Sequence, residues 1–263
     1  MIGVETLPAE SGRYAAELLL VPALWAAPSA WRGSASYLAH RGWGCHLLDV
    51  RAVAGGVAAR AEAVAEYARG LERPVVLVGH DAGGLVAAAA AARTTAAGVV
   101  LLAPVRPGSA AARALVRGPR AVAALVLGAA VPPPRGPALD LVLGGLAESA
   151  RAAVGRALAA EPAAAVRDVA WGRGGLPARP AVPTLVAAGD RDALLPEADA
   201  AALAAAFGAE RIVLEGVGHW PLAGPRWQDV VGLVHRWIVQ RLGESLLELY
   251  GEAMADRDAE EDG

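Results

Sequence analysis

The sequence predicts an α/β fold in which a mostly parallel sheet is flanked by helices on both faces. Short apolar runs alternate with longer helical segments along most of the chain. These runs are almost continuously apolar, which is typical of strands buried between two helical layers. In addition, residues 75–86 run from an apolar strand through a glycine-flanked turn into an Ala-rich helix.

Apolar runs define the expected strands in order. They span residues 17–21, 46–50, 74–79, 98–104, 182–189 and 211–214, and residues 1–15 are expected to add a short strand or arm. Helical segments are expected between them, and the last helix is expected from Trp227 to about Tyr250.

Residues 105–180 have a different character from the rest of the chain. We find no strand-like run of β-branched residues there, and helical patches occur at 110–116, 121–127, 139–146 and 150–159. Because this segment lies between two expected strands, we interpret it as an inserted helical cap. The core would then comprise residues 1–104 and 181–250, followed by an acidic, frayed tail at 251–263.

Composition narrows the possible partners. The formal net charge is −3 and the 24 basic residues, all arginines, form no basic stripe, which argues against nucleic-acid binding. Cys45 is the only cysteine, so an internal disulfide and a Cys-based metal cluster are excluded. No phosphate loop or dinucleotide fingerprint is convincing, and we therefore expect no metal and no organic cofactor.

No feature of the sequence indicates a membrane protein. Every long apolar stretch is interrupted before it reaches the ~20 residues of a bilayer span, and the first residues lack a signal-peptide pattern. The expected location is the cytoplasm of a bacterium. The oligomeric state is not determined by the sequence.

Chemistry-bearing residues follow three of the expected strands. Asp81 lies in the turn G-H-D-A-G, Asp192 lies in G-D-R-D-A-L-L-P, and His219 lies in G-V-G-H-W-P. Because the carboxyl ends of parallel strands meet at one rim of an open sheet, we expect these side chains to converge.

The motifs and their order resemble those of the α/β-hydrolase superfamily, and the resemblance covers nearly the whole chain. It implies an α/β-hydrolase fold with Asp81 at the nucleophile position, Asp192 as the acid and His219 as the base. The common G-x-S-x-G nucleophile turn has an aspartate in place of the serine. The neighbouring Asp190 is interpreted as an N-cap of the following helix.

The stretch L-L-L-V-P-A-L-W resembles the superfamily's oxyanion strand and loop, with P-A in place of the usual H-G. This resemblance implies that the main-chain N–H groups of Leu24 and Ala82 form the oxyanion hole. Trp25 and Trp220 lie on these site loops and Trp171 lies in the cap, so we expect them to line the substrate pocket. The Ala-, Leu- and Val-rich cap favours an apolar small-molecule substrate.

An aspartate at this turn changes the chemistry that is expected. Attack on an ester would give an anhydride, whereas attack on an sp³ carbon bearing a leaving group gives an alkyl-enzyme ester. His219, oriented by Asp192, would then activate water against that ester. This form of the turn resembles epoxide hydrolases, haloalkane dehalogenases and fluoroacetate dehalogenases.

The sequence departs from each of these enzymes. The dehalogenases that it resembles carry Trp or Arg after the nucleophile, and this chain carries Ala82. The epoxide hydrolases place two tyrosines in the cap, whereas the tyrosines here lie outside residues 105–180. Donors in the cap that remain are Trp171, Arg173 and Ser149.

The favoured prediction is cofactor-free hydrolysis of an epoxide or similar electrophilic carbon. The first alternative is a lyase, isomerase or cyclase in which Asp81 and His219 act as an acid/base pair. The second is a catalytically silent relative that binds a ligand or partner. The intact acid and histidine loops count against that second alternative.

Overall fold

The computed structural model describes residues 2–241 of the chain; residue 1 and residues 242–263 lie outside the described part. It contains one seven-stranded sheet with the order β1-β3-β2-β4-β5-β6-β7. The strands are β1 Gly3–Leu7, β2 Glu17–Val21, β3 Gly44–Asp49, β4 Val75–His80, β5 Ala96–Leu102, β6 Thr184–Gly189 and β7 Glu210–Leu214. Edge strand β1 pairs antiparallel with β3, and the other pairings are parallel. The predicted mostly parallel sheet is confirmed.

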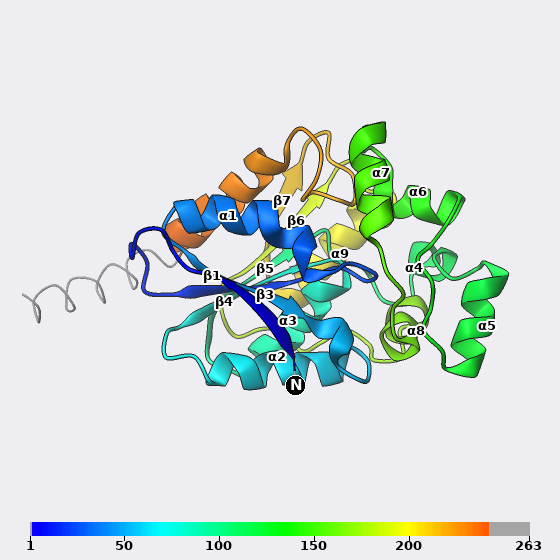
Figure 1. Cartoon of the computed structure of the whole chain (residues 1–263), viewed down its shortest axis with the longest axis horizontal. Coiled ribbons are helices and arrows are strands. Elements are labelled where there is room, and N and C mark those ends of the chain that lie inside the picture. Colours follow the sequence, from blue (N-terminus) through cyan, green and yellow to red (C-terminus); the bar gives the residue numbers. More distant parts are fainter. Residues whose placement is uncertain (1, 242–263) are drawn as a thin grey trace, which may run out of the picture.

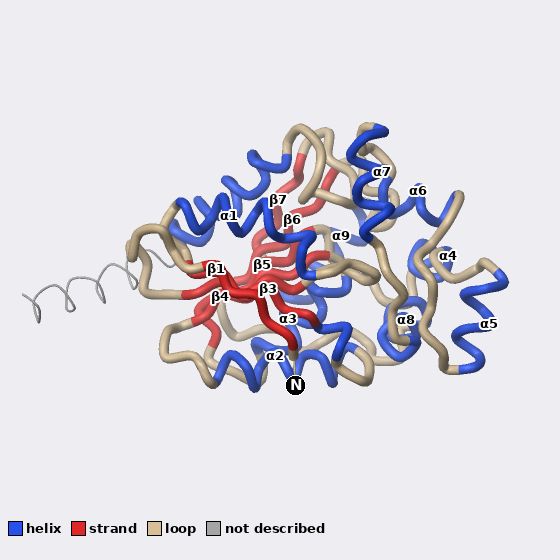
Figure 2. The backbone as a smooth tube through the Cα atoms, viewed as in Figure 1, coloured by secondary structure: helices blue, strands red, loops and turns tan. Residues whose placement is uncertain are grey.

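Helices cover both faces of this sheet (Figures 1 and 2). Helix α1 Arg32–His40 and the helical residues 227–241 share one face, where the rings of Tyr37 and Trp227 lie 6.0 Å apart. Helices α2 Val57–Arg69 and α3 Ala82–Ala91 pack together on the other face, and α9 Glu197–Phe207 packs on β6 and β7. Short 3₁₀ helices, η1 Pro28–Trp31 and η2 Val50–Ala52, follow β2 and β3.

Two of the predicted segments reach beyond the described residues. The last helix is described over residues 227–241, and its predicted continuation to about Tyr250 lies outside the described part. The predicted acidic tail at 251–263 lies outside it entirely.

The 105–180 segment gathers at one end of the sheet (Figure 1, green). It contains α4 Ala110–Ala114, α5 Pro119–Leu127, α6 Pro137–Leu143, α7 Glu148–Ala157 and α8 Ala163–Trp171. Helix α8 is absent from the sequence prediction, although Pro162 precedes it and Gly172, at φ 67°, ends it in the left-handed conformation that favours glycine. The division into core and cap stays a prediction.

The core lies between the sheet and its helices. Strand β4 is buried over its whole length, as is almost all of α3. The small alanine side chains of α3 let this helix lie close to both β4 and α2. This close packing fixes the position of the turn between β4 and α3, which carries Asp81.

Candidate active site

The turn between β4 and α3 holds Asp81 in a strained conformation with φ 55° and ψ −124°. Such a backbone is costly for a residue with a Cβ and persists only where its surroundings enforce it. Here close packing of the neighbouring backbone segments fixes this conformation. A Cβ on Gly79 would lie 2.1 Å from the Gly83 carbonyl oxygen, and one on Gly83 would lie 2.4 Å from the Pro22 carbonyl oxygen. Both glycines are therefore required for β4, α3 and the β2 loop to approach each other.

Asp81, His219 and Asp192 lie together at the carboxyl ends of the strands. His219 Nδ1 donates to Asp192 Oδ2 at 2.9 Å, and His219 Nε2 lies 3.6 Å from Asp81 Oδ1. The other oxygen of Asp192 accepts the main-chain N–H groups of Leu194 and Leu195 at 2.9 and 2.8 Å. These bonds fix the Asp192 carboxylate, which in turn orients the imidazole ring.

The two carboxylate oxygens of Asp81 have different surroundings. Oδ2 accepts the main-chain N–H of Leu24 at 3.0 Å. Oδ1 has no hydrogen-bond partner among the described residues, and the same holds for His219 Nε2. One oxygen is thus held by a main-chain donor, and the other is free and faces the imidazole.

Electrostatics favour a charged site. Burial by itself would raise the pKa of Asp81, but the nearby imidazolium of His219, with help from the Ala82 amide, holds that pKa below its usual value. Burial would lower the pKa of His219, but Asp192 and then Asp81 raise it to about 10. At neutral pH Asp81 is therefore a carboxylate and His219 an imidazolium in the resting site.

Neighbouring residues connect the loops of the site. His80 is buried and donates its Nε2–H to the His219 carbonyl oxygen at 2.8 Å, and burial followed by the charge of His219 lowers its pKa to about 4. The prediction for Asp190 is wrong. Its Oδ1 accepts the N–H of Gly216 at 2.7 Å, and the N-cap position of α9 belongs to Pro196. Asp190 thus joins the loop of Asp192 to the loop of His219.

The three tryptophans predicted for the pocket have different positions. Trp220 lines an apolar cavity of about 190 Å³ together with Ala26, Val154 and Leu222. Trp25 is only 2% exposed, and its polar groups are hydrogen-bonded to the 105–180 segment. Trp171 is 42% exposed at the end of α8.

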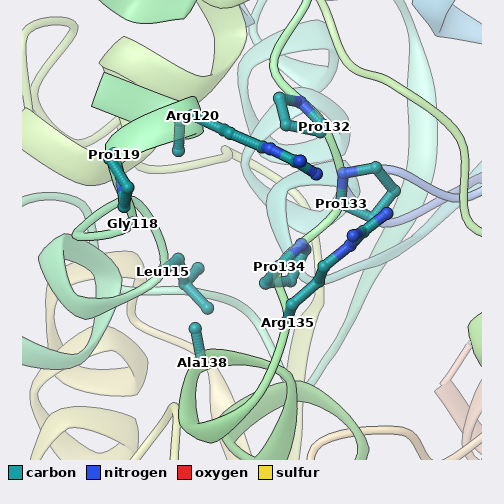
Figure 3. Close-up of a pocket in the computed structure, with 10 residues that line it drawn as sticks. Leu115, Gly118, Pro119, Arg120, Pro132, Pro133, Pro134, Arg135 and Ala138 are labelled. Carbon is teal, nitrogen blue, oxygen red and sulfur yellow. The ribbon is translucent and has the colours of Figure 1, made fainter. Parts of the chain in front are cut away.

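A second cavity, of about 310 Å³, lies within the 105–180 segment (Figure 3). Leu115 and the prolines 132–134 form its apolar lining. Its charged lining residues are Arg120 and Arg135, and both side chains extend toward Pro133 (Figure 3). Neither cavity includes Asp81 in its lining.

Comparison with known proteins agrees with the fold. The model of the alpha/beta hydrolase family matches residues 18–232, so the chain belongs to this family. Among solved structures it is similar to a thermophilic esterase from Thermogutta terrifontis, with 21% identity over 91% of this chain and 93% of that one at a TM-score of 0.68. A monoacylglycerol lipase from Paleococcus ferrophilus is 17% identical over 92% of this chain and 99% of that one, also at 0.68.

A lipase-esterase related protein from Clostridium acetobutylicum is 14% identical over 89% of this chain and 98% of that one, at a TM-score of 0.70. No curated protein matches the chain. Within the described residues, no helix combines the length and the apolar character that crossing a bilayer requires.

Sequence reasoning missed two residues near the site. Arg60 on α2 and Glu161 before α8 form a buried ion pair, and Glu161 also accepts the main-chain N–H of Trp25. Glu161 is 136 positions from Trp25 in the chain. No motif surrounds either residue, so the sequence contains no signal for this contact.

Proposed function

We propose that this protein hydrolyses an epoxide, or a similarly electrophilic sp³ carbon, through an ester with Asp81. The observation that supports this most directly is that only one of the two Asp81 carboxylate oxygens has a hydrogen-bond partner among the described residues. Oδ2 is bonded to the Leu24 amide, while Oδ1 is free and ionised at the end of β4. A carboxylate held in this way presents one oxygen for attack and keeps the other where an oxyanion will later form.

The proposed first step forms the alkyl-enzyme ester. Asp81 Oδ1 attacks a ring carbon, the carbon–oxygen bond of the epoxide breaks, and the electron pair of that bond moves to the oxygen. We assign the proton for this alkoxide to the imidazolium of His219, whose Nε2 lies 3.6 Å from the attacking oxygen. Transfer of this proton leaves His219 as the neutral base that the second step needs.

The proposed second step hydrolyses the ester. Neutral His219, still held by Asp192, takes a proton from water, and the hydroxide adds to Cγ of Asp81. Leu24 and Ala82 donate N–H groups to the oxyanion. Collapse breaks the bond between Cγ and the original Oδ1, which leaves in the diol and takes the proton of the added hydroxyl, so Asp81 ends as a carboxylate and His219 as an imidazolium. The sum is epoxide plus water giving diol.

An apolar substrate is the second part of the proposal. The cavity beside Trp220 is lined by the loops that carry Leu24 and His219 and by α7, and most of the lining side chains are alanine, valine and leucine. Such a lining favours alkyl or aryl groups over charged ones. We therefore expect an epoxide that carries an apolar chain or ring.

The acid/base alternative has its own supporting observation. Asp81 Oδ1 and His219 Nε2 face each other without intervening partners, which also suits a proton shuttle in a lyase, isomerase or cyclase. In that case Asp81 would never become bonded to the substrate.

A single turnover in ¹⁸O-labelled water distinguishes the covalent route through an Asp81 ester from the acid/base route. Protein in excess is mixed with 1,2-epoxyhexane or styrene oxide, and the peptide containing Asp81 is examined by mass spectrometry. The covalent route places label in the Asp81 carboxylate and leaves the first-turnover diol unlabelled. Diol formation with unlabelled Asp81 would contradict the ester, and Asp81→Asn is the control that forms neither.

A further inference from the structure

Trp25 is attached to the 105–180 segment through all of its polar groups. Its main-chain N–H donates to Glu161 Oε2 at 2.7 Å, and its indole N–H donates to the Val131 carbonyl oxygen at 3.1 Å. Its own carbonyl oxygen accepts the N–H of Ala159 at 2.8 Å. Trp25 follows Leu24 directly, and its φ of 61° is unusual for a bulky residue. These contacts hold a strained residue next to the donor that reaches Asp81.

Glu161 is itself held firmly. Its residue is 0% exposed, and its carboxylate forms an ion pair with the buried guanidinium of Arg60 on α2. Two main-chain hydrogen bonds, of 2.7 and 2.9 Å, join Val131 to Glu161 in an antiparallel bridge. One carboxylate thus connects α2, the 105–180 segment and the loop after β2.

The N–H that donates to Asp81 and the N–H that donates to Glu161 belong to adjacent residues, Leu24 and Trp25. The peptide unit ending in the Leu24 N–H donates to Asp81, and the next unit, ending in the Trp25 N–H, donates to Glu161. Only the φ and ψ angles of Leu24 separate these two planar units. Fixing the second unit therefore restricts the direction of the first.

Burial of the ion pair is not explained by stability alone. Desolvation of two charges offsets much of their attraction, and an apolar pair of similar size is often as stable. A carboxylate has one property that an apolar residue lacks, because it accepts the Trp25 N–H while it is paired with Arg60. The contribution of Glu161 is therefore to orient the loop after β2, which carries Leu24 and Trp25.

We propose that Glu161, fixed by Arg60, is a positioning residue that aims the Leu24 amide at Asp81. The oxyanion hole is then complete only while the 105–180 segment is docked on the core. Trp25 serves as the connection between the two and not as a substrate contact. The catalytic consequence rests on the proposed function, whereas the effect on the loop does not.

Two double variants separate positioning from stability. Arg60→Met with Glu161→Gln removes both charges and keeps an acceptor for the Trp25 N–H, so we call it the acceptor-retaining variant. Arg60→Met with Glu161→Leu also removes both charges and has nearly the same volume, but it has no acceptor, so we call it the acceptor-free variant. The Arg151–Asp140 ion pair, which lies in the same segment, supplies the control Arg151→Gln.

The first measurement is amide hydrogen exchange of peptides covering residues 22–26 and 75–80. The acceptor-free variant is expected to exchange faster at 22–26 than the acceptor-retaining variant, with β4 unchanged in both. Trp25→Phe, which loses the indole bond to Val131 together with part of a buried ring, is also expected to raise exchange at 22–26. Equal exchange at 22–26 in the two double variants would overturn the proposal.

The second measurement is turnover of the epoxide that the wild type accepts. Loss of a well-aimed oxyanion donor lowers kcat, so the kcat of the acceptor-free variant is expected to fall about 10- to 100-fold below that of the acceptor-retaining variant. Its KM is expected to stay within about twofold. Equal kcat values would contradict the positioning role. If the wild type forms no ester from any epoxide, the proposed function fails while the exchange data still decide the role of Glu161.

Discussion

Asp81 Oδ1 and His219 Nε2 face each other at 3.6 Å, and neither atom has a hydrogen-bond partner among the described residues. Both side chains are otherwise fixed, Asp81 by the Leu24 N–H and His219 by Asp192. The distance is slightly too long for a hydrogen bond between them. The attacking oxygen and the base nitrogen are therefore both available to a substrate or a water molecule without the loss of a hydrogen bond between them.

The first prediction concerns the residue at the turn. Asp81→Ser restores the common hydrolase pattern and frees the Leu24 N–H to bind a substrate oxyanion. We expect it to hydrolyse p-nitrophenyl acetate about 100-fold faster than Asp81→Ala, since nucleophile, base and oxyanion donors are then all present. Steady-state kinetics on the purified variants measure this. A Ser variant no faster than the Ala variant would mean that His219 and Leu24 are not aligned for acyl transfer.

The second prediction concerns the glycines of the turn. Gly79→Ala places a Cβ 2.1 Å from the Gly83 carbonyl oxygen, and neither backbone can move without separating β4 from α3. We expect the free energy of unfolding to fall by about 3 kcal/mol. Gly12→Ala is the control, because its Cβ would meet nothing within 4 Å. Urea denaturation of both variants checks the difference, and similar midpoints would contradict it.

The third prediction concerns pH. The pKa of His219 is raised from 6.5 to about 10 in the folded protein, so the folded state binds its proton more tightly than the unfolded state does. The resulting stability is complete below pH 6.5 and is lost as the pH rises toward 10. Within this window we expect His219 to contribute a loss of up to about 1.4 kcal/mol per pH unit.

Urea denaturation of wild type and His219→Gln at several pH values isolates this contribution. The wild type is expected to lose stability more steeply than the variant between pH 6.5 and about 10. Parallel curves would show that Asp192 and Asp81 do not hold a proton on His219.

The fourth prediction concerns the apolar cavity and rests on the proposed function. Val154 lines the cavity beside Trp220, so Val154→Phe fills part of it. We expect the KM for 1,2-epoxydecane to rise about tenfold while the KM for 1,2-epoxybutane stays the same. Val122→Phe, at an exposed position on α5, is the matched control. An equal change in KM for both substrates would show that the alkyl chain does not occupy this cavity.

Much of the fold follows from local pattern. The predicted strands lie within one or two residues of β2 to β7. Helix α8 is absent from the prediction because the glycine-rich residues 172–175 that follow it are typical of a loop. The interpretation of Asp190 as an N-cap fails because its carboxylate accepts the Gly216 N–H from the neighbouring loop, although an aspartate after a strand is typical of an N-cap.

The sequence by itself determined the sheet, the order of the three motifs and the aspartate in the turn, because these depend on local patterns of apolar residues and glycine. Tertiary structure decided how each side chain is held. The separation of the two Asp81 oxygens needs the Leu24 amide from the loop after β2, and the orientation of that loop needs Glu161 from far along the chain. Such contacts join residues distant in sequence, and only the packing of the folded chain brings them within hydrogen-bonding distance.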